Sequence, residues 1–140
     1  MEDLFIKRVM NVFIDTYQKG RTPNPCIICN RQIKFGALRE YMQSQGMNKM
    51  ATGHYARIGK TPDGNLAVQR GLDTNKDQSY FLHRLNQKQL ARILMPLGEH
   101  TKTNVYKMAA ELNLDNVHGP ESQDICFLAG QSITTFFSKQ

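Results

Sequence analysis

The stretch Gly20-Arg21-Thr22-Pro23-Asn24-Pro25-Cys26-Ile27-Ile28-Cys29-Asn30 decides how the first part of this 140-residue chain folds. Its two prolines remove backbone donors and disfavour helical angles, so Arg21 to Pro25 is predicted to be a stiff loop. From Asn30 onward, apolar residues recur at helical spacing as far as Gly46. This pattern predicts a helix that begins directly after Cys29.

Other elements follow on both sides of this stretch. Apolar residues at helical spacing from Leu4 to Tyr17 predict a first helix. Short strands are expected at Lys49 to Thr52 and at Tyr55 to Ile58, and a turn at Pro62 to Asn65 leads to a further strand, Leu66 to Gln69. These elements predict a strand followed by a hairpin.

The second half of the chain is predicted to be mostly helical. Asp77 can cap a helix, and apolar residues recur from Tyr80 through Leu94 and again from Val105 to Leu112. Between Leu114 and Ala129 the helical period is lost, which indicates another loop. Together with the strands, this pattern indicates an α/β protein.

Composition and charge narrow the class of protein. Apolar residues make up 40% of the chain and the net charge is +6. A basic surface favours polyanionic partners, although a merely basic soluble surface explains the charge equally well. The chain has no apolar run long enough to cross a bilayer, so we expect a cytoplasmic protein without a membrane partner. Its three cysteines argue against a complete structural disulfide framework.

Cys26 and Cys29 are the strongest candidates for chemistry. Two thiols three residues apart can share a metal ion or exchange a disulfide, whereas an isolated cysteine is more often a small buried hydrophobe. Because Cys29 is expected just before a helix, with Arg31 and Lys34 nearby, its thiolate should be stabilised. We therefore expect Cys29 to be the better nucleophile. For Cys126, sequence spacing leaves a structural role open.

Weaker signals lie in the middle of the chain. Gly53 follows an expected strand, where a glycine permits close approach of backbone to a ligand, and His54 stands beside it. A histidine in such a place is more often structural than catalytic. Lys76, Asp77 and Gln78 precede an expected helix and suit phosphate or base contacts, or simply a helix cap.

Five ordered motifs together resemble the tRNA 2-thiouridylases of the MnmA family. They are GRTPNPCIICN (20–30), IKFG (33–36), ATGHY (51–55), KDQSYFL (76–82) and SQDICF (122–127). The resemblance implies the later part of a Rossmann-like ATP-pyrophosphatase (PP-loop) catalytic domain over residues 1–92. Residues 93–140 would then begin a mostly helical tRNA-binding domain, with a loop over about 115–130 returning Cys126 to the catalytic domain.

The resemblance also implies an activity, tRNA-uridine 2-sulfurtransfer. ATP with magnesium would adenylate the C2 oxygen of the wobble uridine, and a cysteine persulfide charged by a sulfur-donor protein would deliver sulfur to C2. Cys29 matches the nucleophile and Cys126 the persulfide carrier, and the two would form a transient disulfide. The segment that touches the target base matches Asn24, Pro25 and Cys26. An ATP-contacting glycine matches Gly53, and tRNA-contacting positions match His54, Lys76, Asp77 and Gln78.

Two departures from the family pattern matter. Many members carry Asp where this chain has Cys26, so Cys26, Cys29 and Cys126 could instead hold an iron-sulfur cluster. The glycine-rich loop that holds ATP phosphates and the family's C-terminal barrel are absent, so we expect this chain to be inactive alone. The alternative is a non-catalytic tRNA- or metal-binding fragment whose three thiols hold a cluster or zinc. The sequence leaves the oligomeric state open.

Overall fold

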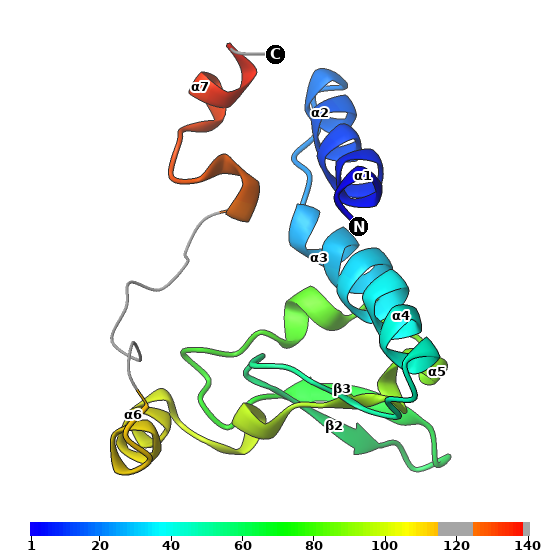
Figure 1. Cartoon of the computed structure of the whole chain (residues 1–140). Helices are drawn as coiled ribbons and strands as arrows, with labels where there is room; N and C mark the ends of the chain where they lie inside the picture. The colour runs from blue at the N-terminus through cyan, green and yellow to red at the C-terminus, as the bar shows by residue number, and fades with distance from the viewer. Residues whose placement is uncertain (115–124, 139–140) are drawn as a thin grey trace.

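The computed structural model describes residues 1–114 and 125–138 (Figure 1). The first predicted helix is confirmed and begins earlier than Leu4. It runs through α1 (Glu2–Phe5), a π-helical turn (Ile6–Met10) and α2 (Asn11–Gln18). Gly20 then adopts the left-handed conformation, with φ +69°, and its N–H donates to the carbonyl of Tyr17. A glycine at this position ends the helix without steric cost.

The second helix begins earlier than predicted. It comprises α3 (Pro25–Cys29), a π-helical stretch (Asn30–Leu38) and α4 (Arg39–Ser44). Asn24 caps it, its Oδ1 accepting from the N–H of Ile27 at 3.4 Å, and Pro25 occupies the first position, where no donor is needed. The prediction that the helix starts after Cys29 is therefore wrong. Both cysteines of the pair lie inside the helix.

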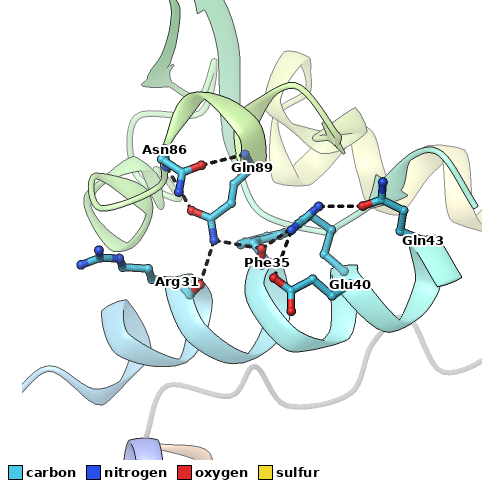
Figure 2. Close-up of polar contacts among 7 residues, drawn as sticks. Arg31, Phe35, Glu40, Gln43, Asn86 and Gln89 are labelled. Atoms are coloured by element: carbon cyan, nitrogen blue, oxygen red, sulfur yellow. Dashed lines mark hydrogen bonds and ion pairs between the residues drawn. The ribbon is translucent and has the colours of Figure 1, made fainter.

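The π-helical stretch is fixed from outside by Gln89, which is only 6% exposed (Figure 2). Its Nε2 donates to the carbonyl oxygens of Arg31 (2.8 Å) and Phe35 (2.9 Å). The Oε1 of Gln89 accepts from the backbone N–H of Asn86, and the backbone N–H of Gln89 donates to Asn86 Oδ1, which forms a capping box at the start of α5 (Gln87–Leu90). A Cβ at Gly36 would lie 2.9 Å from the carbonyl oxygen of Arg31, so the wide turn requires glycine there.

The strands form two small sheets. β1 (Met50–Ala51) pairs in parallel with β4 (Ile93–Leu94), and β2 (Ala56–Lys60) pairs antiparallel with β3 (Leu66–Arg70). The hairpin prediction is confirmed. The helical prediction for Ile93 and Leu94 is wrong, because pairing with β1 recruits them into a sheet. The α/β class is correct, and the predicted division of the chain at residue 92 remains a prediction.

Short helices complete the chain and make the region after Asp77 less regular than predicted. The further elements are 3₁₀ turns at Ser79–Leu82, Pro96–Glu99 and Cys126–Leu128, and the helices α6 (Lys102–Glu111) and α7 (Ile133–Phe137). Most of the loop expected over 115–130 lies outside the described residues. No helix in the described ranges is long and apolar enough to cross a membrane.

Two separate hydrophobic cores hold these elements. The central core packs the second helix against the sheets and contains Phe35, Ala56, Leu82 and Ile93. The aromatic core is built on Phe13, Leu128 and Phe136, and joins the first helix to the C-terminal segment. In Figure 1 the C-terminal segment, coloured orange to red, lies opposite α2, although the two are far apart in the sequence. The candidate site is lined by residues of the second helix, which packs on the central core, and of the turn at Cys126–Leu128, which packs on the aromatic core.

Candidate active site

A cleft with a volume of about 450 Å³ gathers residues from both ends of the chain. One wall comes from the loop before α3 and from the helix that follows it, and the opposite wall comes from the turn that begins at Cys126. The cleft is lined by Phe5, Val9, Pro23, Asn24, Pro25, Cys26, Cys29, Asn30, Lys34, His54, Gln78, Phe81, Ile125, Cys126 and Phe127. All three cysteines of the chain therefore face one space.

Cys26 and Cys29 form the helical wall and are partly buried. Burial raises the pKa of the Cys26 thiol above its ordinary value, Cys126 raises it further, and the Lys34 ammonium partly offsets both. For Cys29, burial is again the main cause of a raised pKa. Lys34 opposes it, while Cys126 and Cys26 add to it. The expectation of a stabilised Cys29 thiolate is therefore wrong, because desolvation outweighs nearby positive charge.

Cys126 differs from the other two thiols in being exposed. It begins a three-residue 3₁₀ turn whose next residue, Phe127, makes edge-on ring contacts with Phe5 at 6.1 Å and Phe13 at 5.1 Å between centroids. Leu128 is buried in the aromatic core. The turn is thus anchored by the side chains that follow Cys126, while the thiol itself stays accessible to a macromolecule.

Two further polar residues, Asn30 and His54, line this cleft. Asn30 is 2% exposed, and its Nδ2 donates to the carbonyl of Phe81 at 3.2 Å. Its Oδ1 is buried without a hydrogen-bond partner in the described structure. His54 Nδ1 shares a hydrogen bond of 2.7 Å with the hydroxyl of Thr52, and burial, followed by the charge of Lys34, lowers the pKa of His54 to about 4. His54 is therefore neutral at physiological pH.

Comparison with known proteins identifies the family of this chain. The family described as the tRNA methyl transferase HUP domain matches residues 1–130. The chain belongs to this family. It is 47% identical over 139 residues to a tRNA-specific 2-thiouridylase MnmA of Carboxydothermus hydrogenoformans, covering 99% of this chain and 38% of that protein. The corresponding protein of Treponema denticola is 45% identical over 96% of this chain and 37% of its own length. The chain thus spans less than two fifths of these relatives.

Of the remaining predicted site residues in this HUP-domain chain, some line the cleft and others lie outside it. Gln78 lines the cleft, and its Oε1 accepts from the backbone N–H of Tyr55 at 3.0 Å. Asp77 does not line it. Its carboxylate accepts from the backbone N–H groups of Gly71 and Ser79 and from the Ser79 hydroxyl. Partial burial raises the pKa of Asp77, but these hydrogen bonds and Arg70 outweigh it, and the pKa is lowered overall.

Gly53 and Lys76 also lie outside the cleft lining. Gly53 is exposed just beyond the end of β1, and a Cβ there would meet only a methyl group of Leu97, at 3.8 Å. It lies just past the carboxyl end of a parallel strand, where ligands bind in α/β folds, and its contact with ATP remains a prediction. Lys76 is partly buried in the turn that precedes Asp77.

The metal-site prediction does not fit the geometry. Among residues 1–114 and 125–138, no three His, Cys, Asp or Glu side chains gather closely enough to hold a metal ion. The three cysteines share the cleft as free thiols rather than as a cluster site or a disulfide. We therefore derive no step through an iron-sulfur cluster or zinc.

Sequence reasoning missed two parts of the site in this family member. Asn30 and Phe81 line the cleft and bond to one another, although neither was singled out. Asn30 could have been found as an amide on the apolar face of a helix, directly beside Cys29. Phe81 could not, because an aromatic residue in an apolar run carries no signal of its own.

Proposed function

We propose that this chain carries the sulfur-transfer site of a tRNA-uridine 2-sulfurtransferase. The observation that supports the proposal most is the cleft itself, in which a half-buried Cys29 and an exposed Cys126 face the same space. Two free thiols from distant parts of a chain form no covalent bond that would stabilise the fold. A sulfur relay requires that arrangement.

In the proposed reaction Cys126 carries the persulfide and Cys29 releases its sulfur. A sulfur-donor protein transfers a sulfane sulfur to the exposed Cys126, forming a persulfide. ATP, with magnesium, adenylates the C2 oxygen of the wobble uridine and releases pyrophosphate. Cys29 gives its proton to solvent and attacks the inner sulfur of the persulfide, the S–S bond breaks, and hydrosulfide leaves with the electron pair. Hydrosulfide adds to C2 and AMP departs with the former C2 oxygen. The resulting Cys29–Cys126 disulfide is then opened by a thiol reductant.

The cleft suggests how the target nucleoside would be held. Asn24, Pro25 and Cys26 line the cleft, and His54 and Gln78 line it as well. We assign Asn24, Pro25 and Cys26 to the target base, His54, Lys76, Asp77 and Gln78 to tRNA, and Gly53 to ATP. The net charge of +6 favours a polyanionic partner such as tRNA.

The test is a chimera. Residues 1–140 would replace the matching segment of the Carboxydothermus hydrogenoformans relative, and 2-thiouridine in tRNA would be measured by nucleoside mass spectrometry. Cys29→Ser and Cys126→Ser should each abolish 2-thiouridine, because each removes one partner of the relay. Undiminished 2-thiouridine in either variant would contradict the proposal.

Cys26→Ser is the matched control. It removes a thiol from the same wall of the cleft but not from the relay, so 2-thiouridine should fall, because Cys26 contacts the target base, without being abolished. Should all three serine variants lose activity alike, and iron with them, the transfer would instead depend on a metal cluster.

A further inference from the structure

We propose that Lys34 is the cation of the cleft: its ammonium group balances the negative charge that moves from the attacking Cys29 thiolate to the departing hydrosulfide. This inference deepens the proposed function and rests on it. Lys34 supplies a positive charge to the relay, which neither thiol can provide.

The composition of the cleft wall is the first support. Among the residues described, Lys34 is the single Lys or Arg that lines the cleft, and no Asp or Glu lines it. Lys34 forms no salt bridge with a described residue. The titratable groups around it are Cys26, Cys29, Cys126 and His54, and at neutral pH His54 is uncharged. Nothing in the described wall therefore competes for the ammonium group.

The shape of the helix is the second support. Lys34 is the fifth residue after Cys29, and in an α-helix two side chains at this spacing point about 140° apart. The stretch Asn30–Leu38 is π-helical instead. Cys29 directly precedes this stretch, and the i→i+5 bonding of the stretch makes each turn wider than an α-helical turn. The wide turn thus moves Lys34 toward the face that carries the thiols.

This wide turn is held by specific contacts rather than by chance. Gln89 donates to the carbonyls of Arg31 and Phe35, which flank Lys34 in the sequence (Figure 2). Gly36 leaves room for the Arg31 oxygen. A buried amide with two carbonyl partners is costly to disrupt. π-Helical turns commonly occur at functional sites, and this one carries Lys34, the one Lys or Arg of the cleft lining within residues 1–114 and 125–138.

The chemistry needs such a cation because the wall is otherwise poor in charge. Burial disfavours the Cys29 thiolate, and the neighbouring thiols oppose it further, whereas Lys34 favours it. When Cys29 attacks, the negative charge passes from its sulfur to the hydrosulfide, so one ammonium group can stabilise both the reactant and the leaving group.

The experiment measures thiol reactivity in this chain without tRNA or ATP. Alkylation of each cysteine by iodoacetamide would be followed by peptide mass spectrometry between pH 6 and pH 10. In Lys34→Met, alkylation of Cys29 at neutral pH should fall about tenfold and its midpoint should move to higher pH. Lys34→Arg should retain the wild-type profile, since it keeps the charge. Lys60→Met, on the exposed end of β2, is the matched control and should change nothing.

Two results would overturn the inference. Identical Cys29 profiles in the wild type and Lys34→Met would show that the charge does not reach the thiol. Equal losses in Lys34→Met and Lys34→Arg would show that shape rather than charge matters. Should Lys34→Met fail to fold, Lys34→Gln provides the same test with a polar side chain. Because no tRNA is involved, this test can fail while the chimera still thiolates tRNA, and the reverse.

Discussion

The two walls of the cleft are built differently. Cys26 and Cys29 lie in a capped helix that packs on the central core, and both are partly buried. Cys126 is exposed on a turn of three residues, which Phe127 and Leu128 fasten to the aromatic core. A buried thiol and an accessible one suit the two halves of a relay, in which one group must be met by a donor protein and the other shielded from it.

The two walls of the cleft are also stabilised by different hydrophobic cores. Because each wall depends on its own core, a substitution in one core should move one thiol relative to the other. Substitutions in the aromatic core should disturb Cys126, and substitutions around Gln89 should disturb the helical wall.

Phe13→Ala should have the largest effect. Phe13 is fully buried and contacts the rings of Tyr17, Phe127, Phe136 and Phe137. Loss of a buried phenylalanine costs about 3–5 kcal/mol of unfolding free energy. Urea denaturation measures this cost, and Tyr41→Ala, at an exposed position, is the control. Cys29–Cys126 crosslinking by a short bismaleimide should fall as well, and unchanged crosslinking would show that the aromatic core does not position Cys126.

Gln89→Leu should come next. It removes the side-chain donor of the Arg31 carbonyl and one of the two side-chain donors of the Phe35 carbonyl, and loss of hydrogen bonds to buried polar groups costs about 1–3 kcal/mol. Gln87→Leu is the matched control, since its two hydrogen bonds to the Leu66 backbone are exposed and should be worth less. Equal losses of unfolding free energy in the two variants would argue against an anchored π-helical stretch.

The unfolding free energy should fall at acidic pH because His54 is neutral in the folded chain. Its pKa falls to about 4 on folding, so between that pH and about 6.5 the unfolded chain binds the additional proton. The contribution of His54 is thus fully present above pH 6.5 and is lost as pH falls toward 4, by about 2 kcal/mol after allowing for its partial exposure. The difference in unfolding free energy between wild type and His54→Gln measures this loss, and a difference independent of pH would contradict the buried neutral histidine.

Asn24→Ala should have the smallest effect. It removes the cap of α3, but the 3.4 Å bond to Ile27 is long, so we expect about 0.5–1 kcal/mol. Thermal unfolding measures the change. Asn24→Ser, which can still cap the helix, should recover most of it, and no recovery would mean that Asn24 acts through other contacts.

The sequence predicted those elements whose signals are local. Helical periodicity located the first helix, and the Pro62 to Asn65 turn located the hairpin. The start of the second helix was missed because Pro25 was taken as a helix breaker, whereas proline is well suited to a first helical position. Ile93 and Leu94 were assigned to a helix because a two-residue strand has no period, and only pairing with β1 defines it.

The candidate site was predictable in part for the same reason. Cys26 and Cys29 stand out locally, but the approach of Cys126 depends on aromatic contacts between Phe13 and Phe127, which spacing does not reveal. The family resemblance, rather than any local pattern, suggested that the thiols act together. The raised pKa of Cys29 was missed because burial is a property of the folded chain.

The most direct test of the relay is a persulfide chase on this chain. Cys126 would be persulfidated with a small sulfane donor, the donor removed, and the sulfur species followed by mass spectrometry together with released hydrosulfide. The account predicts that hydrosulfide appears as a Cys29–Cys126 disulfide forms, and that Cys29→Ser prevents both while Cys26→Ser does not. A persulfide that stays on Cys126, or that resolves onto Cys26, would contradict it.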